Sequence, residues 1–122
     1  MNAILVVSHG SRYPQTKTEV AALCEKLQKA NADDLVAYAF LELENPSIPD
    51  AIDACVEKGA GRVIVLLNFL NSGKHVDEDI PAIIKAAQTK YPVVPFFLSR
   101  PIGLHPDITA LFQETVTRLK KI

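Results

Sequence analysis

Three side chains that can bind a metal ion, His9, Glu42 and His75, each follow a run of apolar residues in this chain. Imidazole and carboxylate groups suit borderline first-row metal ions, and a set of three ligands leaves coordination positions open. Histidine can also accept a proton near neutral pH. If the three side chains meet, the sequence therefore predicts metal coordination, proton transfer, or a reaction that uses both.

Alternating strands and helices are predicted to position these residues. The expected strands are residues 3–7, 35–41, 62–67 and 93–98. After each strand, apolar residues recur at helical spacing, and Ser47 with Asp50 matches a capping box at the start of the second helix. The apolar helical positions are Val20, Leu23, Cys24 and Leu27; Ile48, Ile52, Cys55 and Val56; Ile80, Ile83, Ile84 and Ala87; and Ile108, Leu111, Phe112, Val116 and Leu119.

This order predicts a single α/β domain over residues 1–122, with one four-stranded parallel sheet and helices on both faces. A flavodoxin-like, three-layer α/β/α arrangement with strand order 2-1-3-4 is the simplest solution, because it sets the first and third strands side by side. His9, Glu42, His75 and His105 follow the four strands in turn. Because parallel strands end at one edge, we expect all four residues at that edge.

Composition excludes several classes of function. The 13 basic and 14 acidic residues give a formal charge of −1, and no basic patch indicates a nucleic acid partner. No segment approaches the roughly 20 apolar residues of a membrane span, so no membrane partner is expected. Cys24 and Cys55 form no CxxC motif. They are predicted to be reduced core residues of a cytoplasmic protein.

Other polar residues near the strand ends have less specific interpretations. Ser11, Arg12, Lys74 and Arg100 are candidates for binding anionic groups, or are ordinary surface residues. Asp77, Glu78 and Asp79 are best explained as first-turn charges that complement a helix dipole. Glu44 is expected to be a solvated turn residue. His105, which precedes Pro106, is expected to have a structural or supporting role.

The motifs taken together resemble the CbiX/SirB family of class II chelatases, and in particular its short, single-repeat form. The resemblance covers nearly the whole chain: VSHGSR, FLELENPSIPDAI, LNFLNSGKHVDEDIP and RPIGLHPDI occur in the family's order. It implies a sirohydrochlorin chelatase of cobalamin or siroheme biosynthesis, in which His9, His75 and Glu42 face a tetrapyrrole cleft. Long members hold two such domains in one chain, so the resemblance implies a homodimer here. Asn71-Ser72-Gly73-Lys74 departs from the more aliphatic, Gly-rich family pattern before the histidine.

The resemblance implies no tightly bound cofactor, because Co²⁺ or Fe²⁺ would be a substrate. Ser11, Arg12, Lys74 and Arg100 would hold the carboxylates of the macrocycle, while one histidine accepts pyrrole protons and the other guides the metal. The sequence does not choose between cobalt, iron and nickel. Two alternatives stay open: a non-catalytic module that binds or delivers metal, and a phosphate-handling enzyme suggested by His9-Gly10-Ser11-Arg12. The latter ranks low, since no phosphate loop is present.

Overall fold

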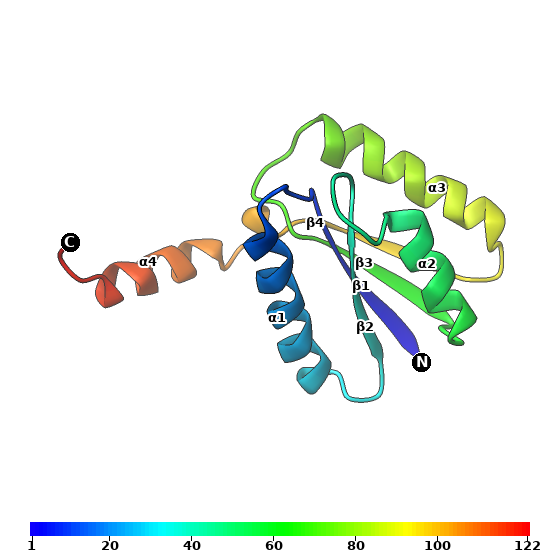
Figure 1. The fold of residues 1–122 in the computed structure, drawn as a ribbon, viewed down its shortest axis with the longest axis horizontal. Coiled ribbons are helices and arrows are strands. Elements are labelled where there is room, and N and C mark those ends of the chain that lie inside the picture. The colour runs from blue at the N-terminus through cyan, green and yellow to red at the C-terminus, as the bar shows by residue number, and fades with distance from the viewer.

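A computed structural model describes residues 1–122 as a four-stranded parallel sheet with helices on both faces (Figure 1). The strands are β1 (Asn2–Ser8), β2 (Leu35–Phe40), β3 (Arg62–Leu67) and β4 (Phe96–Pro101). The α-helices are α1 (Pro14–Ala30), α2 (Ile48–Glu57), α3 (Ile80–Lys90) and α4 (Ile108–Arg118). Two short helical turns, His75–Asp79 and Ile102–Leu104, precede α3 and α4.

The strand order is β2-β1-β3-β4, which confirms the predicted order 2-1-3-4. β1 is central: Ala3 pairs with Leu35 of β2 on one side and with Val63 of β3 on the other. All pairings are parallel, so each strand needs a helical crossover before the next. The loops after β1, β2 and β3 consequently lie at one edge of the sheet.

Local sequence signals set the helix starts. Pro14, Pro49 and Pro81 occupy the first positions of α1, α2 and α3, where a helix needs no N–H from that residue. The predicted cap at Ser47 is confirmed, because its hydroxyl oxygen accepts a hydrogen bond of 3.2 Å from the Asp50 backbone N–H.

The fourth strand lies further along the chain than residues 93–98, where we predicted it. It runs from Phe96 to Pro101, while Val93 is 90% exposed in the preceding turn. Pro92 and Pro95 flank that turn and cannot donate to a strand ladder, which explains why the apolar pair Val93-Val94 does not begin the strand.

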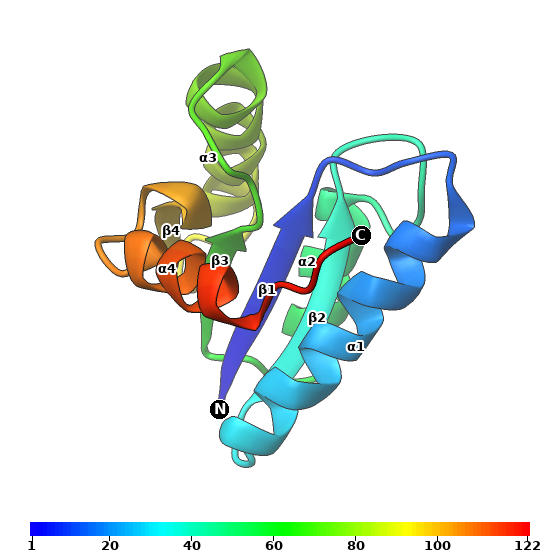
Figure 2. The same cartoon turned by 90° about the vertical axis from the view of Figure 1, so that its left-hand side faces the viewer.

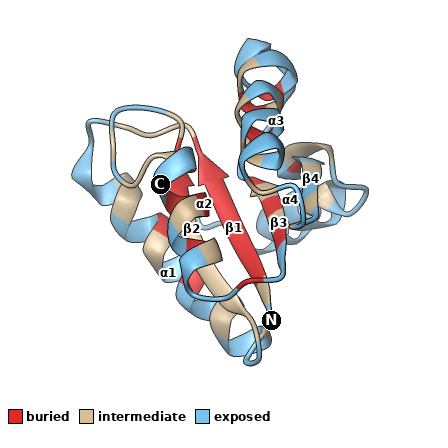
Figure 3. Cartoon of the chain, turned by 90° about the vertical axis from the view of Figure 1, so that its right-hand side faces the viewer, coloured by how far each residue is buried: buried red, intermediate tan, exposed pale blue.

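The two faces of the sheet are covered unequally. α2 and α3 cover one face and bury the larger core, in which Leu5, Ile52 and Ile80 are at most 1% exposed. α1 covers part of the opposite face and buries a smaller cluster of Val6, Val20, Cys24 and Phe40. Figure 2 shows α1 and α2 on opposite sides of the sheet, and Figure 3 shows buried residues concentrated in β1.

The last helix departs from the expected packing on the sheet. α4 has no buried residue, and it extends away from the body of the domain (Figure 1). The predicted apolar residues are nevertheless present, with Leu111, Phe112 and Val116 between 58% and 65% exposed. Helical periodicity therefore predicted the helix correctly and its packing within this chain incorrectly.

Both cysteines are free and buried, as predicted. Burial raises the pKa of the Cys24 and Cys55 thiols, because the thiolate form loses its solvation in an apolar environment. None of the helices is both long enough and apolar enough to cross a lipid bilayer.

Candidate metal site

His9 and Glu42 are brought together because strand pairing continues past the ends of β1 and β2. The Leu41 N–H donates to the Ser8 carbonyl at 2.9 Å, and the Glu42 N–H donates to the His9 carbonyl at 3.0 Å. The side chains then meet directly, with His9 Nε2 2.8 Å from Glu42 Oε1. The parallel register alone therefore places this pair at the predicted edge.

Gly10 allows the two loops to approach so closely. Its φ is +100°, a region that side-chain-bearing residues rarely adopt. A Cβ atom at this position would lie 1.7 Å from the backbone carbonyl oxygen of Glu42. Glycine is thus required both by the backbone conformation after His9 and by the space beside Glu42.

His75 enters from the other side, on the helical turn His75–Asp79 that precedes α3. This turn is a π-helix, a form that often occurs at functional sites. His75 Nδ1 lies 2.8 Å from Asp79 Oδ2, so the carboxylate accepts the Nδ1 proton and leaves Nε2 available as a ligand. Our sequence interpretation of Asp79 as a helix-dipole charge missed this contact, although the spacing of four residues from His75 could have indicated it.

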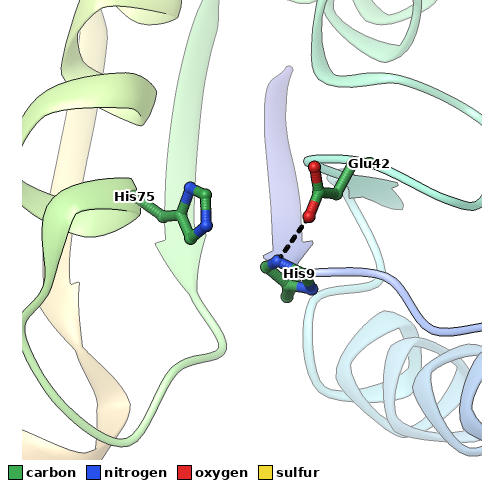
Figure 4. A group of neighbouring side chains, drawn as sticks. All are labelled: His9, Glu42 and His75. Carbon is green, nitrogen blue, oxygen red and sulfur yellow. Dashed lines mark ion pairs between the residues drawn. The ribbon is translucent and has the colours of Figure 1, made fainter.

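The three predicted ligands converge: one ligand atom from each of His9, Glu42 and His75 lies within 4.8 Å of the others. The two imidazole rings are 5.1 Å apart between centroids, and Figure 4 shows the His75 ring beside the His9–Glu42 pair. Metal–ligand bonds of about 2.0–2.2 Å place ligand atoms no more than about 4.4 Å apart. Small side-chain rotations would therefore enclose an ion.

The site is open to solvent. The side chains of His9, Glu42 and His75 are 40%, 50% and 46% exposed. An ion held by these three groups would keep coordination positions for water or for another ligand. The arrangement thus suits transfer of an ion better than permanent storage.

The hydrogen bonds of His9 indicate which of its ring nitrogens carries a proton and which faces Glu42. His9 Nδ1 lies 2.9 Å from the Gly10 carbonyl, which can only accept, so Nδ1 carries a proton. Nε2 and the carboxylate oxygen both present lone pairs if neither is protonated. At 2.8 Å these two atoms are close enough to share a proton, or to be drawn apart by a metal ion that both would bind.

Some polar residues on the loops of His9, Glu42 and His75 connect two loops by hydrogen bonds, and others make no ion pair. The Ser11 N–H donates to Glu44 Oε1 at 2.8 Å, so Glu44 joins two loops and is not simply a solvated residue. The Ser11 hydroxyl oxygen accepts from the Tyr13 N–H at 3.0 Å. Arg12 and Lys74 are exposed and form no ion pair, which leaves both cations available.

Arg100 and His105 are not brought to the trio. Both line an apolar groove on the α1 face of the sheet, to which none of the three ligands contributes. His105 Nδ1 accepts a hydrogen bond of 3.0 Å from the Asp107 N–H, so this imidazole shapes the turn before α4. The structural role expected for His105 is thereby supported, while Arg100 is separated from the other predicted anion-binding residues.

The fold and the trio define an α/β domain with a candidate site for a first-row metal ion at the carboxyl edge of its sheet. Comparison with known protein families agrees with this description of the fold. The family model described as CbiX matches residues 3–119, and the chain belongs to this family. The resemblance inferred from the motifs is thus confirmed.

The names of similar proteins refer to chelatases. A sirohydrochlorin cobaltochelatase of Priestia megaterium is 38% identical over 121 residues, which are 99% of this chain and 38% of that protein. A sirohydrochlorin ferrochelatase of the same organism is 31% identical, over 95% of this chain and 44% of its own length. The crystal structure of the chelatase SirB from Bacillus subtilis subspecies spizizenii, in complex with cobalt, superposes with a TM-score of 0.82 at 33% identity. That match covers 98% of this chain and 51% of SirB. The chain therefore spans about half or less of these relatives.

Proposed function

We propose that this protein is a chelatase that inserts Co²⁺ or Fe²⁺ into sirohydrochlorin. The observation that carries the proposal is the convergence of His9, Glu42 and His75 within 4.8 Å at an exposed edge of a CbiX-family domain. The names of the Priestia megaterium relatives supply the substrate class, with one cobalt and one iron enzyme among them. Imidazole and carboxylate ligands accept either ion, so the ligand set does not choose between them.

In the proposed reaction, the ion is bound by the three side chains and loses water as pyrrole nitrogens replace it. His75 contributes Nε2, because its Nδ1 proton is held by Asp79. Insertion displaces two pyrrole protons. His9 Nε2, freed as the ion leaves it, takes up one of them and shares it with the Glu42 carboxylate, and the other passes to the solvent that reaches this exposed site. Loose binding favours this transfer, since a tightly held ion would stabilise the ground state.

The rim of the site offers positive charge for an anionic macrocycle. Arg12 lies three residues after His9, and Lys74 directly precedes His75, and both are exposed. Arg12 can bind a carboxylate in a bidentate manner, whereas Lys74 acts as a point charge. Ser11 can still donate through its hydroxyl hydrogen. We assign the peripheral carboxylates of sirohydrochlorin to these three residues and place Arg100 outside the group.

A second copy of the chain would complete the site. The three side chains of the trio are 40–50% exposed, and this chain superposes on only 51% of SirB. A homodimer would supply a second domain of the same fold opposite the first. The free, buried cysteines agree with the reducing conditions of the cytoplasm, where we place the protein.

A non-catalytic module that binds and delivers metal would use the same ligands. The exposure of all three side chains favours the chelatase, because an ion in this site remains accessible to a second ligand. The two functions differ in one respect that can be measured: only the chelatase accelerates metal insertion into free sirohydrochlorin.

The decisive experiment is an anaerobic absorbance time course of sirohydrochlorin with Co²⁺ and, separately, with Fe²⁺. We expect the wild type to accelerate insertion and His75→Ala to lose the acceleration by about 100-fold or more, as removal of a key catalytic group commonly does. Asp77→Ala is the matched control, since this exposed carboxylate lies in the same turn and, unlike Asp79, forms no hydrogen bond or ion pair with His75. Metal binding by the wild type without acceleration would reject the chelatase in favour of the delivery module.

A further inference from the structure

Leu43, directly after the metal ligand Glu42, is the one residue other than glycine that has a positive φ, at +70°. The Glu44 N–H donates to the Glu42 carbonyl, two residues earlier, at 2.9 Å, and this bond closes a γ-turn around Leu43. A γ-turn with positive φ is rare and strained, because the Cβ atom of its central residue crowds a neighbouring carbonyl oxygen. Strained backbone therefore lies beside the candidate metal site.

Hydrogen bonds on both sides of the γ-turn hold its backbone in place. The Glu42 N–H donates to the His9 carbonyl at 3.0 Å. Glu44 Oε1 accepts from the Ser11 N–H at 2.8 Å. Neither bond uses the side chain of Leu43. Glycine or asparagine at this position would therefore suit the same backbone at a lower cost, since both tolerate a positive φ.

Packing of the Leu43 side chain does not offset this strain. Leu41, two residues earlier, packs against the larger core, whereas Leu43 belongs to neither core cluster and is 53% exposed. Leucine thus lowers stability here in two ways, through its backbone conformation and through apolar surface left in water. Departures from local rules of this kind are expected where a side chain serves a ligand.

The substrate of the proposed function, on which this inference rests, has a part that no residue yet contacts. The metal trio is assigned to the centre of the macrocycle, and Ser11, Arg12 and Lys74 to its peripheral carboxylates. The conjugated ring between them is flat and apolar, and ligand sites combine a few polar groups with an apolar lining. Consecutive Cα atoms are about 3.8 Å apart, so the residue after a metal ligand is within reach of the ring around the ion.

We propose that Leu43 packs against the face of the tetrapyrrole ring and is a specificity-determining residue of the site. Burial of its exposed surface by the ring supplies affinity that does not depend on charge, and so selects a flat apolar ring over other polycarboxylates. The γ-turn fixes the position of Leu43 before the substrate arrives, which lowers the loss of conformational freedom on binding. The same turn thereby presents a metal ligand and an apolar contact side by side.

The test is the affinity of the full chain for sirohydrochlorin, measured by fluorescence titration without metal. Leu43→Asn keeps a residue that tolerates the γ-turn and removes the apolar contact. We expect its Kd to rise about 10-fold, as for the loss of one leucine-sized apolar contact. Leu43→Met keeps an apolar side chain of similar volume and should bind like the wild type. Val93→Asn is the matched control, since Val93 is 90% exposed in the turn before β4, at the opposite edge of the sheet.

Two further measurements separate a substrate contact from a structural role. Leu43→Asn should bind Co²⁺ as the wild type does, because Glu42 and its turn are retained. Its midpoint temperature of unfolding should not fall, because asparagine tolerates the positive φ better than leucine does. A lower midpoint, or an equal loss of Co²⁺ and sirohydrochlorin affinity, would show that Leu43 only shapes the loop and would overturn the proposal. Unchanged sirohydrochlorin affinity in Leu43→Asn would also overturn it.

Failure of this contact and failure of the proposed function give different results, because binding is measured without metal and insertion with it. A wild type that binds sirohydrochlorin but does not accelerate insertion would reject the chelatase, and weak binding by Leu43→Asn would still support the contact. Insertion by the wild type with an unchanged KM in Leu43→Asn would reject the contact alone. A wild type that does not bind sirohydrochlorin would reject both.

Discussion

The two faces of the sheet differ in how much of their apolar surface the chain covers by itself. On the α2 and α3 face, Leu5, Ile52 and Ile80 are at most 1% exposed. On the α1 face, Phe97 is 48% exposed beside an apolar groove. The first face is a closed core within one chain, whereas the second leaves apolar side chains exposed to solvent.

The metal trio, His9, Glu42 and His75, comes from loops that lead to helices on opposite faces of the sheet. His9 lies on the loop that leads into α1, while His75 lies on the turn that leads into α3. The candidate site thus depends on both halves of the domain holding their loops in position. Substitutions on each side should therefore have different consequences for stability, association and metal binding.

The largest expected difference is between a core residue and an α4 residue. Ile52→Ala should lower the free energy of unfolding by about 2–5 kcal/mol, because it leaves a cavity under α2. Leu111→Ala should change it by no more than roughly 0.5 kcal/mol in the monomer. Urea unfolding of both variants, at protein concentrations where the wild type is monomeric, measures the contrast. Equal losses would show that α4 packs on its own domain.

Gly10 tests the α1 side of the site. Gly10→Ala should cost at least about 1–3 kcal/mol, since alanine must adopt a positive φ or displace the Glu42 backbone. Gly73→Ala is the control, because a Cβ atom there meets nothing within 4 Å. Thermal unfolding gives the stability, and Co²⁺ titration should show weaker binding only for Gly10→Ala. Unaltered Co²⁺ binding in that variant would mean that the His9–Glu42 approach is not needed for the ion.

Asp79 tests the α3 side. Asp79→Ala should weaken Co²⁺ binding by roughly 10–100-fold, because His75 loses the group that fixes its ring and its protonated nitrogen. Asp79→Glu should recover part of the affinity, a result that a merely structural role would not give. Asp77→Ala, in the same turn, should bind Co²⁺ as the wild type does. Equal affinities for Asp79→Ala and Asp77→Ala would remove Asp79 from the site.

The smallest expected effect concerns Asp53, which joins α2 to the end of α3. Hydrogen bonds from Tyr91 and then from Lys90 lower the pKa of the Asp53 carboxyl from its ordinary 3.8. The ionised form is therefore stabilised on folding, fully above pH 3.8 and less as the pH falls through the lower folded-state pKa. Asp53→Asn should be slightly less stable than the wild type at neutral pH.

The pH dependence is the distinguishing measurement for this contact. The difference in midpoint temperature between wild type and Asp53→Asn should stay constant from pH 7 to about pH 5 and disappear in more acidic buffer. Glu57→Gln, which changes a neighbouring helical carboxylate without these partners, should show no such trend. A difference that grows on acidification would contradict the assigned hydrogen bonds.

The sequence by itself determined the order of the elements, the sheet order and which three candidate ligands would converge. Alternating apolar runs and helical periodicity required parallel strands with crossover helices, and the ends of such strands lie at one edge. His9, Glu42 and His75 had to meet once the order 2-1-3-4 was chosen. Local rules were also sufficient for the Ser47 cap, because its chemistry involves residues only three apart.

Tertiary structure alone decided which polar residues join the trio and which apolar residues stay uncovered. The contacts from Asp79 to His75 and from Glu44 to Ser11 depend on how turns close in three dimensions. The periodicity of α4 predicted that Leu111 and Phe112 would be buried, whereas they are 58% and 65% exposed in the structure. A hydrophobic pattern shows that one side of a helix is apolar. Whether the same chain covers that side depends on the direction in which the preceding turn sends the helix.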